Sequence, residues 1–239
     1  YKPVNDKLES HIQLNDTRPE SEFFKAIAYD NEQDLDAKLI EELRRQYDRL
    51  DPNKDEKLAI LVRVNREVEH IRRLGEKAGI FVETDTGGRL FQSEPALDLF
   101  KLILALQNHT NTLHLLNLYT TPYVSRPFPK HKIIEMRKNV EKLNEWVQKD
   151  PPLRKWREYI KQLKLKPVLS VLHELILDAR PWDTYAQGKE HVLPGERIKF
   201  QRYYKNLLDQ LLEKLIQLGE TEYLTLNRIE RYLRLMITT

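Results

Sequence analysis

Residues 58 to 62 read Leu-Ala-Ile-Leu-Val, and this unbroken apolar run decides how the first third of the sequence is interpreted. Five apolar residues without polar alternation are typical of a strand that is covered on both faces, as in a parallel sheet. Two other segments predict strands as well, residues 22 to 29 (EFFKAIAY) and residues 80 to 83 (IFVE). Together the three segments predict a parallel sheet.

Helical patterns separate the predicted strands. Asp34 is a favourable N-cap residue, and the apolar side chains that follow it up to Leu50 fall on one helix face. A second helix is predicted over residues 65 to 77 and closed by Gly79. Alternating strands and helices predict an α/β layer, and because three strands make an incomplete sheet, we expect the chain to be a piece of a longer protein.

The rest of the sequence predicts helices almost throughout. The expected segments begin at Glu94 and continue at residues 112–119, 130–148, 153–163, 167–178 and 196–218, with Gly219 ending the longest helix and Thr225 capping the last one. The fold-class prediction is therefore an incomplete α/β parallel sheet over residues 1 to 85, followed by an all-α region over residues 86 to 239.

Composition excludes several classes of protein. The 239 residues are 40% hydrophobic and 32% charged, with no cysteine, which predicts a globular chain without disulfides, thiolate zinc sites or a cysteine nucleophile. No apolar run approaches the roughly 20 residues that span a bilayer. The formal charge of +3 is unevenly distributed, since residues 126 to 166 hold 13 basic and 5 acidic side chains. That segment is a candidate anion-binding surface.

The sequence lacks the motifs of several enzyme classes. The Gly188-Lys189 pair does not belong to a GxxxxGK[ST] phosphate loop. His173 begins an HExxH-like string, but Leu177 stands where the second zinc ligand is needed. No carboxylate stands out as a tuned acid or base. We therefore expect no catalytic residue, no metal site and no activity from this chain alone.

One region resembles a known family. It contains the strings AILVRVNR at residues 59–66, AGI at 78–80, TGGRLF at 86–91 and EPALD at 94–98. Their order resembles that of superfamily 1 DNA helicases of the UvrD/Rep type, in which a buried strand ending in R-x-N is followed by a helix, an A-G-I string and a G-G-x-x-F-F string. The order of these strings along the chain, rather than any single string, carries the resemblance.

The resemblance implies a domain organisation and partners. Residues 1 to 85 would be the first part of a RecA-like motor domain, residues 86 to 239 a helical 2B-like insertion, and Gly87 and Gly88 a hinge between them. The parent protein would use ATP and Mg, which this fragment would not bind itself. Its partners would be single-stranded and duplex DNA and the remaining helicase domains, without a membrane. Its location would be cytoplasmic and nucleoid-associated.

The resemblance and the charge distribution together suggest DNA-binding residues. By family likeness, Arg63 would meet a phosphate and Asn65 a sugar or base, although Arg63 could be a surface ion-pair partner and Asn65 a helix N-cap. The basic stretch could hold duplex phosphates, or it could be a set of ordinary solvated helix faces. Its candidate residues are Lys130, Lys132, Arg137, Lys138, Arg154, Lys155 and Arg157, with Lys161, Lys164 and Lys166 beyond them.

Two other functions remain open. The apolar stripe of residues 196 to 218 could dock a partner helix in a protein-interaction scaffold, or the chain could bind nucleic acid without ATP. Trp146, Trp156 and Trp182 are expected in the core rather than as base-stacking platforms. The helicase interpretation depends on the opening segments forming part of a sheet that is completed by chain beyond residue 239.

Overall fold

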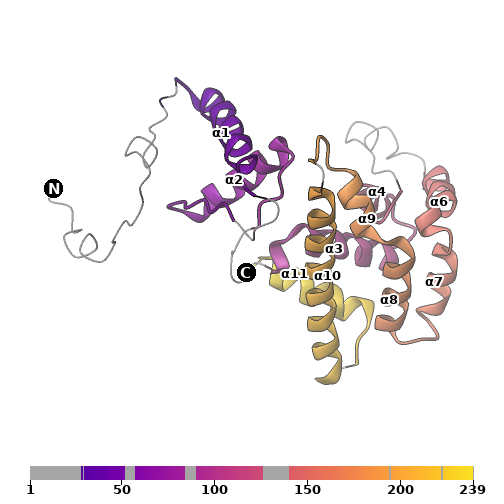
Figure 1. Ribbon diagram of the computed structural model, residues 1–239. Helices are drawn as coiled ribbons and strands as arrows, with labels where there is room; N and C mark the ends of the chain where they lie inside the picture. Colours follow the sequence, from indigo (N-terminus) through magenta and orange to yellow (C-terminus); the bar gives the residue numbers. More distant parts are fainter. Residues whose placement is uncertain are drawn as a thin grey trace.

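The computed structural model describes residues 28, 30–51, 57–83, 90–125, 140–193, 195–221 and 223–238. Over these ranges the chain forms α-helices and two short 3-10 helices, η3 (Leu90–Gln92) and η4 (Pro151–Leu153), without any strand (Figure 1). Buried side chains form two hydrophobic cores, a small one between the first two helices and a large one among the helices from α3 onward.

Most of the predicted helices are present. Their bounds are α1 (Glu32–Tyr47), α2 (Asn65–Ala78), α3 (Glu94–Gln107), α4 (Thr112–Leu118), α6 (Val140–Lys149), α7 (Trp156–Gln162), α8 (Val168–Ala179), α9 (Pro181–Gln187), α10 (Glu196–Thr221) and α11 (Leu226–Thr238). Helix α9 was not predicted. Gly219 does not end α10, which continues to Thr221.

The predicted parallel sheet is wrong for the described residues. The run at residues 58 to 62 has no regular secondary structure, and Leu61 is 95% exposed rather than buried. Residues 80 to 83 likewise form no strand, and residues 22 to 27 and 29 lie outside the described ranges. The physical reason is that α1 and α2 bury their apolar faces against each other, so that no sheet is needed to cover them.

Local signals explain how the α1 and α2 pair forms. Asn31, rather than the predicted Asp34, is the N-cap of α1, and its side chain accepts a hydrogen bond from the Asp34 main-chain N–H at 3.0 Å. Gly79 ends α2 with φ 75°, a left-handed conformation that glycine adopts without strain. The small core between the helices is formed by Leu43, Leu74, Ala78 and Ile80.

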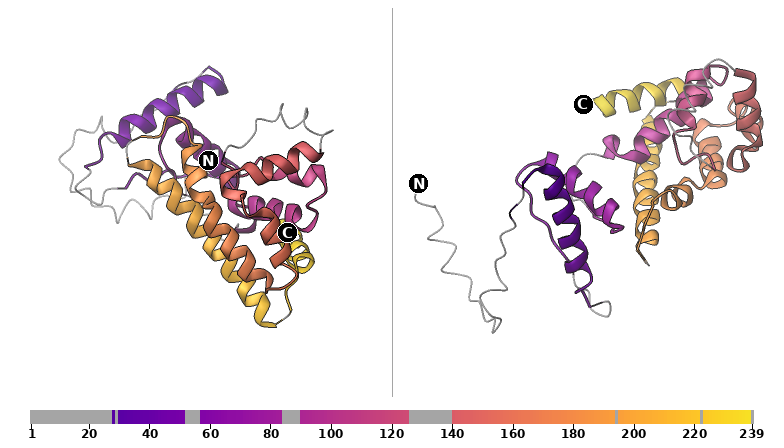
Figure 2. Two further views of the ribbon diagram at one scale, coloured as in Figure 1. Left: turned by 90° about the vertical axis from the view of Figure 1, so that its right-hand side faces the viewer. Right: turned by 90° about the horizontal axis from the view of Figure 1, so that it is seen from above.

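Helix α3 lies at the centre of the bundle. It packs against α4, α10 and α11, and α10 also packs against α9 (Figures 1 and 2). The apolar stripe of α10 places Leu208, Leu211 and Leu215 in the large core with no exposed surface. These three leucines are therefore buried inside the bundle rather than open to a partner helix.

A buried glutamate connects the α1 and α2 pair to the bundle. Glu196, in the first turn of α10, is only 1% exposed. Its carboxylate accepts hydrogen bonds from the Tyr47 hydroxyl at 2.8 Å and from the Phe81 main-chain N–H at 2.7 Å. Because Tyr47 is the last residue of α1 and Phe81 closely follows α2, one side chain fixes the ends of both helices against α10.

Candidate nucleic-acid interface

Helix α7 has one buried face and one exposed face. Trp156 and Tyr159 are each 1% exposed, and Ile160 and Leu163 pack partly against the large core. Main-chain hydrogen bonds extend the helical turns beyond α7 itself, from the Lys155 carbonyl to the N–H of residue 166. The surface opposite the buried side chains consequently faces solvent over about thirteen residues.

The exposed face of this segment carries four basic side chains at helical spacing. All four are exposed: Arg157 and Lys161 on α7, Arg154 just before its N-cap Lys155, and Lys164 just after its C-cap Leu163. They lie three, four and three residues apart, a spacing that places them on one side of a helical segment. Within the part of the chain that the structure describes, none of them forms an ion pair. Their charges are therefore available to an external anion.

Two further lysines of the same segment are neutralised by α8. The Lys155 ammonium lies 2.7 Å from Asp178, and the Lys166 ammonium lies 3.2 Å from Glu174. The hydrogen bond from Lys155, together with one from the Tyr159 hydroxyl, lowers the pKa of Asp178. These lysines lie beside the four-residue group but are already paired within the protein.

One acid accompanies the exposed cations. Glu158 is exposed, and its carboxylate accepts a hydrogen bond from the Gln162 side chain at 2.9 Å. Four cations against one carboxylate leave this face positive. Such a face attracts anions, above all those that carry several charges at regular spacing.

The structure describes only some of the other predicted DNA-binding residues. Arg63 is exposed just before α2, where its main-chain N–H donates to the Glu67 carboxylate at 3.0 Å. Asn65 is the first residue of α2 and not its N-cap, which is Val64. Lys130, Lys132, Arg137, Lys138 and the predicted hinge residues Gly87 and Gly88 lie outside the described ranges.

The structure groups the sequence candidates differently from the prediction. Arg154, Lys155 and Arg157 lie together at the start of α7, as expected from their sequence spacing. Arg63 does not join them, because α2 and α7 lie at opposite ends of the described structure (Figures 1 and 2). Trp156 and Trp182 are buried and Trp146 packs against the large core, which confirms the prediction that the tryptophans are core residues.

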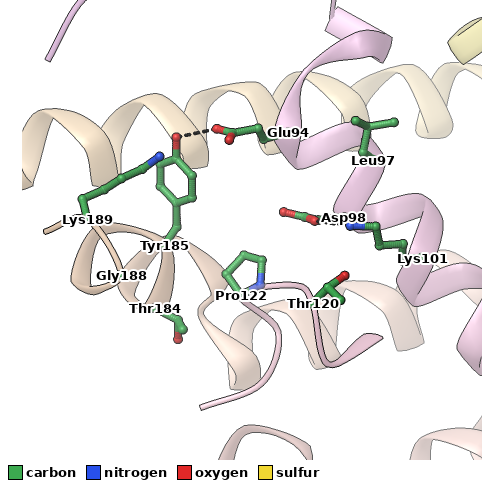
Figure 3. A pocket seen from close by; sticks show the side chains of 10 residues that line it. All are labelled: Glu94, Leu97, Asp98, Lys101, Thr120, Pro122, Thr184, Tyr185, Gly188 and Lys189. Atoms are coloured by element: carbon green, nitrogen blue, oxygen red, sulfur yellow. Dashed lines mark hydrogen bonds and ion pairs between the residues drawn. The ribbon is translucent and has the colours of Figure 1, made fainter. Parts of the chain in front are cut away.

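A pocket of about 350 Å³ lies between α3, the turn after α4, and α9 (Figure 3). Asp98 projects into it from α3 with only 8% of the residue exposed, and accepts hydrogen bonds from the Tyr204 hydroxyl at 3.2 Å and the Lys101 ammonium at 3.4 Å. Burial raises the pKa of Asp98 to about 6. Sequence reasoning missed this acid, although its flanking residues Leu97 and Leu99 are apolar.

The opposite wall of the pocket belongs to α9 and the residues after it. The Tyr185 hydroxyl donates to Glu94 at 2.6 Å, and the Lys189 ammonium lies 4.3 Å from the centre of the Tyr185 ring (Figure 3). Lys189 also pairs with Glu76 of α2 at 3.0 Å. Each charged side chain of the pocket thus has a partner within the protein, so the pocket presents no unpaired charge to a ligand. The ion pair between Lys189 and Glu76 joins this wall of the pocket to α2.

The rest of the described structure offers few other candidate sites. The described residues contain no group of three side chains that could hold a metal ion. None of their helices is both long and apolar enough to cross a bilayer. No protein-family model, curated protein or solved structure matches the chain. The exposed basic face of α7 is therefore the feature on which a functional proposal can be built.

Proposed function

We propose that the chain is a DNA-binding helical unit that uses the exposed face of α7 to hold the phosphate backbone of a duplex. The observation that supports this proposal is the separation of the two faces of α7, with Trp156 and Tyr159 in the core and the unpaired cations outside. Neutralised phosphates release counterions, and this release drives most sequence-independent binding to DNA.

We also propose that this unit works within a superfamily 1 DNA helicase. The sheet on which the helicase interpretation depended is absent from the described residues, so the order of motifs over residues 59 to 98 is the support that this proposal keeps. The DNA contact and the helicase context therefore rest on different observations. ATP and Mg would act in other parts of such a protein, because this sequence has no phosphate-binding loop.

The protein-interaction alternative has less support. It requires an open apolar stripe on α10, whereas Leu208, Leu211 and Leu215 are fully buried within the bundle. Two large apolar side chains of α10 do face solvent, Ile198 at 47% exposure and Ile216 at 53%. They lie eighteen residues apart, and scattered exposed apolar side chains are ordinary at a protein surface and do not make a docking site.

Fluorescence anisotropy with the full chain and a labelled duplex tests the proposed function. We expect binding at about 50 mM salt that weakens as salt is added and that requires neither ATP nor Mg. A duplex that remains unbound at low salt would contradict the proposal. ATP hydrolysis by the purified chain, with or without DNA, would contradict the expectation that it lacks catalytic residues.

A further inference from the structure

We infer that one row of cations on α7 contacts successive phosphates on a single strand of duplex DNA, an inference that rests on the proposed function. The row, called the α7 row below, consists of Arg154, Arg157, Lys161 and Lys164. It differs from the predicted basic stretch because it leaves out Lys155 and Lys166, which are paired with carboxylates of α8.

The length of the row fits a short stretch of DNA backbone. Ten residues separate its ends, which corresponds to about 15 Å at about 1.5 Å per residue. One strand of B-DNA rises about 3.4 Å along the duplex axis per phosphate, but because the strand winds around that axis its successive phosphates lie about 7 Å apart, so about 15 Å of backbone spans about three phosphates. Four cations on a segment of this length can therefore contact about three successive phosphates, with two neighbouring side chains sharing one of them. The planar guanidinium of arginine can donate two hydrogen bonds to two oxygens of the same phosphate.

The aromatic residues of α7 favour duplex over single-stranded DNA. Proteins that hold single strands stack bases on exposed aromatic rings beside a basic groove. On α7 the aromatic side chains, Trp156 and Tyr159, are each 1% exposed and belong to the opposite face. The row therefore offers charge without a stacking platform, which suits a backbone whose bases are already paired and stacked. Contacts of this kind position the DNA without reading its sequence.

The paired lysines define the limits of the row. For Lys155 or Lys166 to bind a phosphate, each would have to leave a carboxylate of α8 that it already contacts. Exchanging one anionic partner for another gives little net gain. Arg154 lies close enough to lower the pKa of Asp178 through its charge, but it forms no ion pair with it in the described structure. Lys155 and Lys166 thus serve as matched controls with the same charge on the same segment.

Salt-dependent binding by substituted full-length chains tests the inference. The row variants are Arg157→Ala, Lys161→Ala and their combination, and the controls are Lys155→Ala and Lys166→Ala. The readout is the slope of log K against log salt between about 50 and 200 mM for one duplex of about 20 base pairs. We expect each row substitution to reduce the magnitude of the slope by about 0.9 and the combination by about 1.8. The two controls should retain the slope of the unaltered chain.

A charge-gain variant extends the test without removing a contact. Glu158→Gln deletes the acid that accompanies the row, and Glu158 is exposed, so the fold should tolerate the change. Binding to the duplex should tighten several-fold at low salt. A variant that binds more weakly would contradict a contact on this face.

Each outcome bears on one claim. Two outcomes would contradict phosphate contacts by the α7 row while leaving the proposed function in place. In the first, the unaltered chain binds the duplex but the row variants keep its salt slope. In the second, the controls lose as much of the slope as the row variants. If a single strand of the same sequence binds more tightly than the duplex, the duplex assignment is overturned. If the unaltered chain binds neither DNA at about 50 mM salt, the proposed function itself fails and the inference fails with it.

Discussion

Replacing Asp98 with asparagine is expected to stabilise the chain near neutral pH. Burial raises the pKa of this carboxyl from 3.8 to about 6, so the folded state holds the proton more tightly than the unfolded chain does. The stability that protonated Asp98 provides is therefore present below about pH 4 and is lost as the pH rises through about 6. At about 1.36 kcal/mol per pKa unit, the difference corresponds to about 3 kcal/mol.

Asparagine keeps the size and the hydrogen-bonding oxygen of the side chain but cannot ionise. Urea unfolding of the unaltered chain and of Asp98→Asn, measured from pH 4 to pH 8, should give similar stabilities at the acidic end. At pH 7.5 the variant should be more stable by about 2–3 kcal/mol. The control is Glu213→Gln, which changes an exposed acid of α10 and should leave the pH dependence as it is. If Asp98→Asn is less stable than the unaltered chain at pH 7.5, the ionised carboxylate stabilises the fold through Lys101 and Tyr204, and the reasoning is refuted.

Two further substitutions test how the α1 and α2 pair is held against the bundle. Glu196→Ala leaves the Tyr47 hydroxyl and the Phe81 N–H without their acceptor, and thermal denaturation should show a loss of about 2–4 kcal/mol; an unchanged midpoint would contradict a structural role. Gly79→Ala should be more destabilising than Gly195→Ala, because both glycines have positive φ but only the first would bring its new methyl group against a main-chain carbonyl. Equal losses in the two alanine variants would show that backbone strain alone is responsible.

Helices were predictable from the sequence because their determinants are local. Gly79 and Thr225 act within one turn of the helices that they limit, and the Thr225 hydroxyl accepts from the Arg228 N–H at 3.3 Å as expected of a cap. Helix α9 was missed because it follows α8 after Arg180 alone, whose left-handed φ of 45° is not signalled by its residue type. Gly219 remains helical because α10 is held by packing on its neighbours, which overrides the weak propensity of one glycine.

The sheet could not be judged from the sequence because a strand depends on its neighbours. The apolar run at residues 58 to 62 has the composition of a buried strand, yet nothing in the described structure pairs with it. Short apolar runs do not by themselves distinguish buried from exposed segments. Leu61, at 95% exposure, shows how far the actual environment departs from the predicted one.

The candidate site was predictable only as a region. Counting charges located the basic stretch that contains α7, but the sequence does not tell which of its lysines are paired. Asp178 and Glu174, which neutralise two of them, lie on the following helix. The burial of Asp98 likewise depends on Tyr204, a hydrogen-bond partner 106 positions further along the chain. Both features come from tertiary packing rather than from local pattern.

The affinity of the unaltered chain for a duplex at two salt concentrations tests the central claim most directly. Three phosphate contacts give a slope of about 2.7, which corresponds to about a 40-fold weaker affinity at about 200 mM than at about 50 mM salt. We predict a loss of this size. An affinity that hardly changes over this range, or no detectable binding at the lower concentration, would contradict a DNA-binding role for α7.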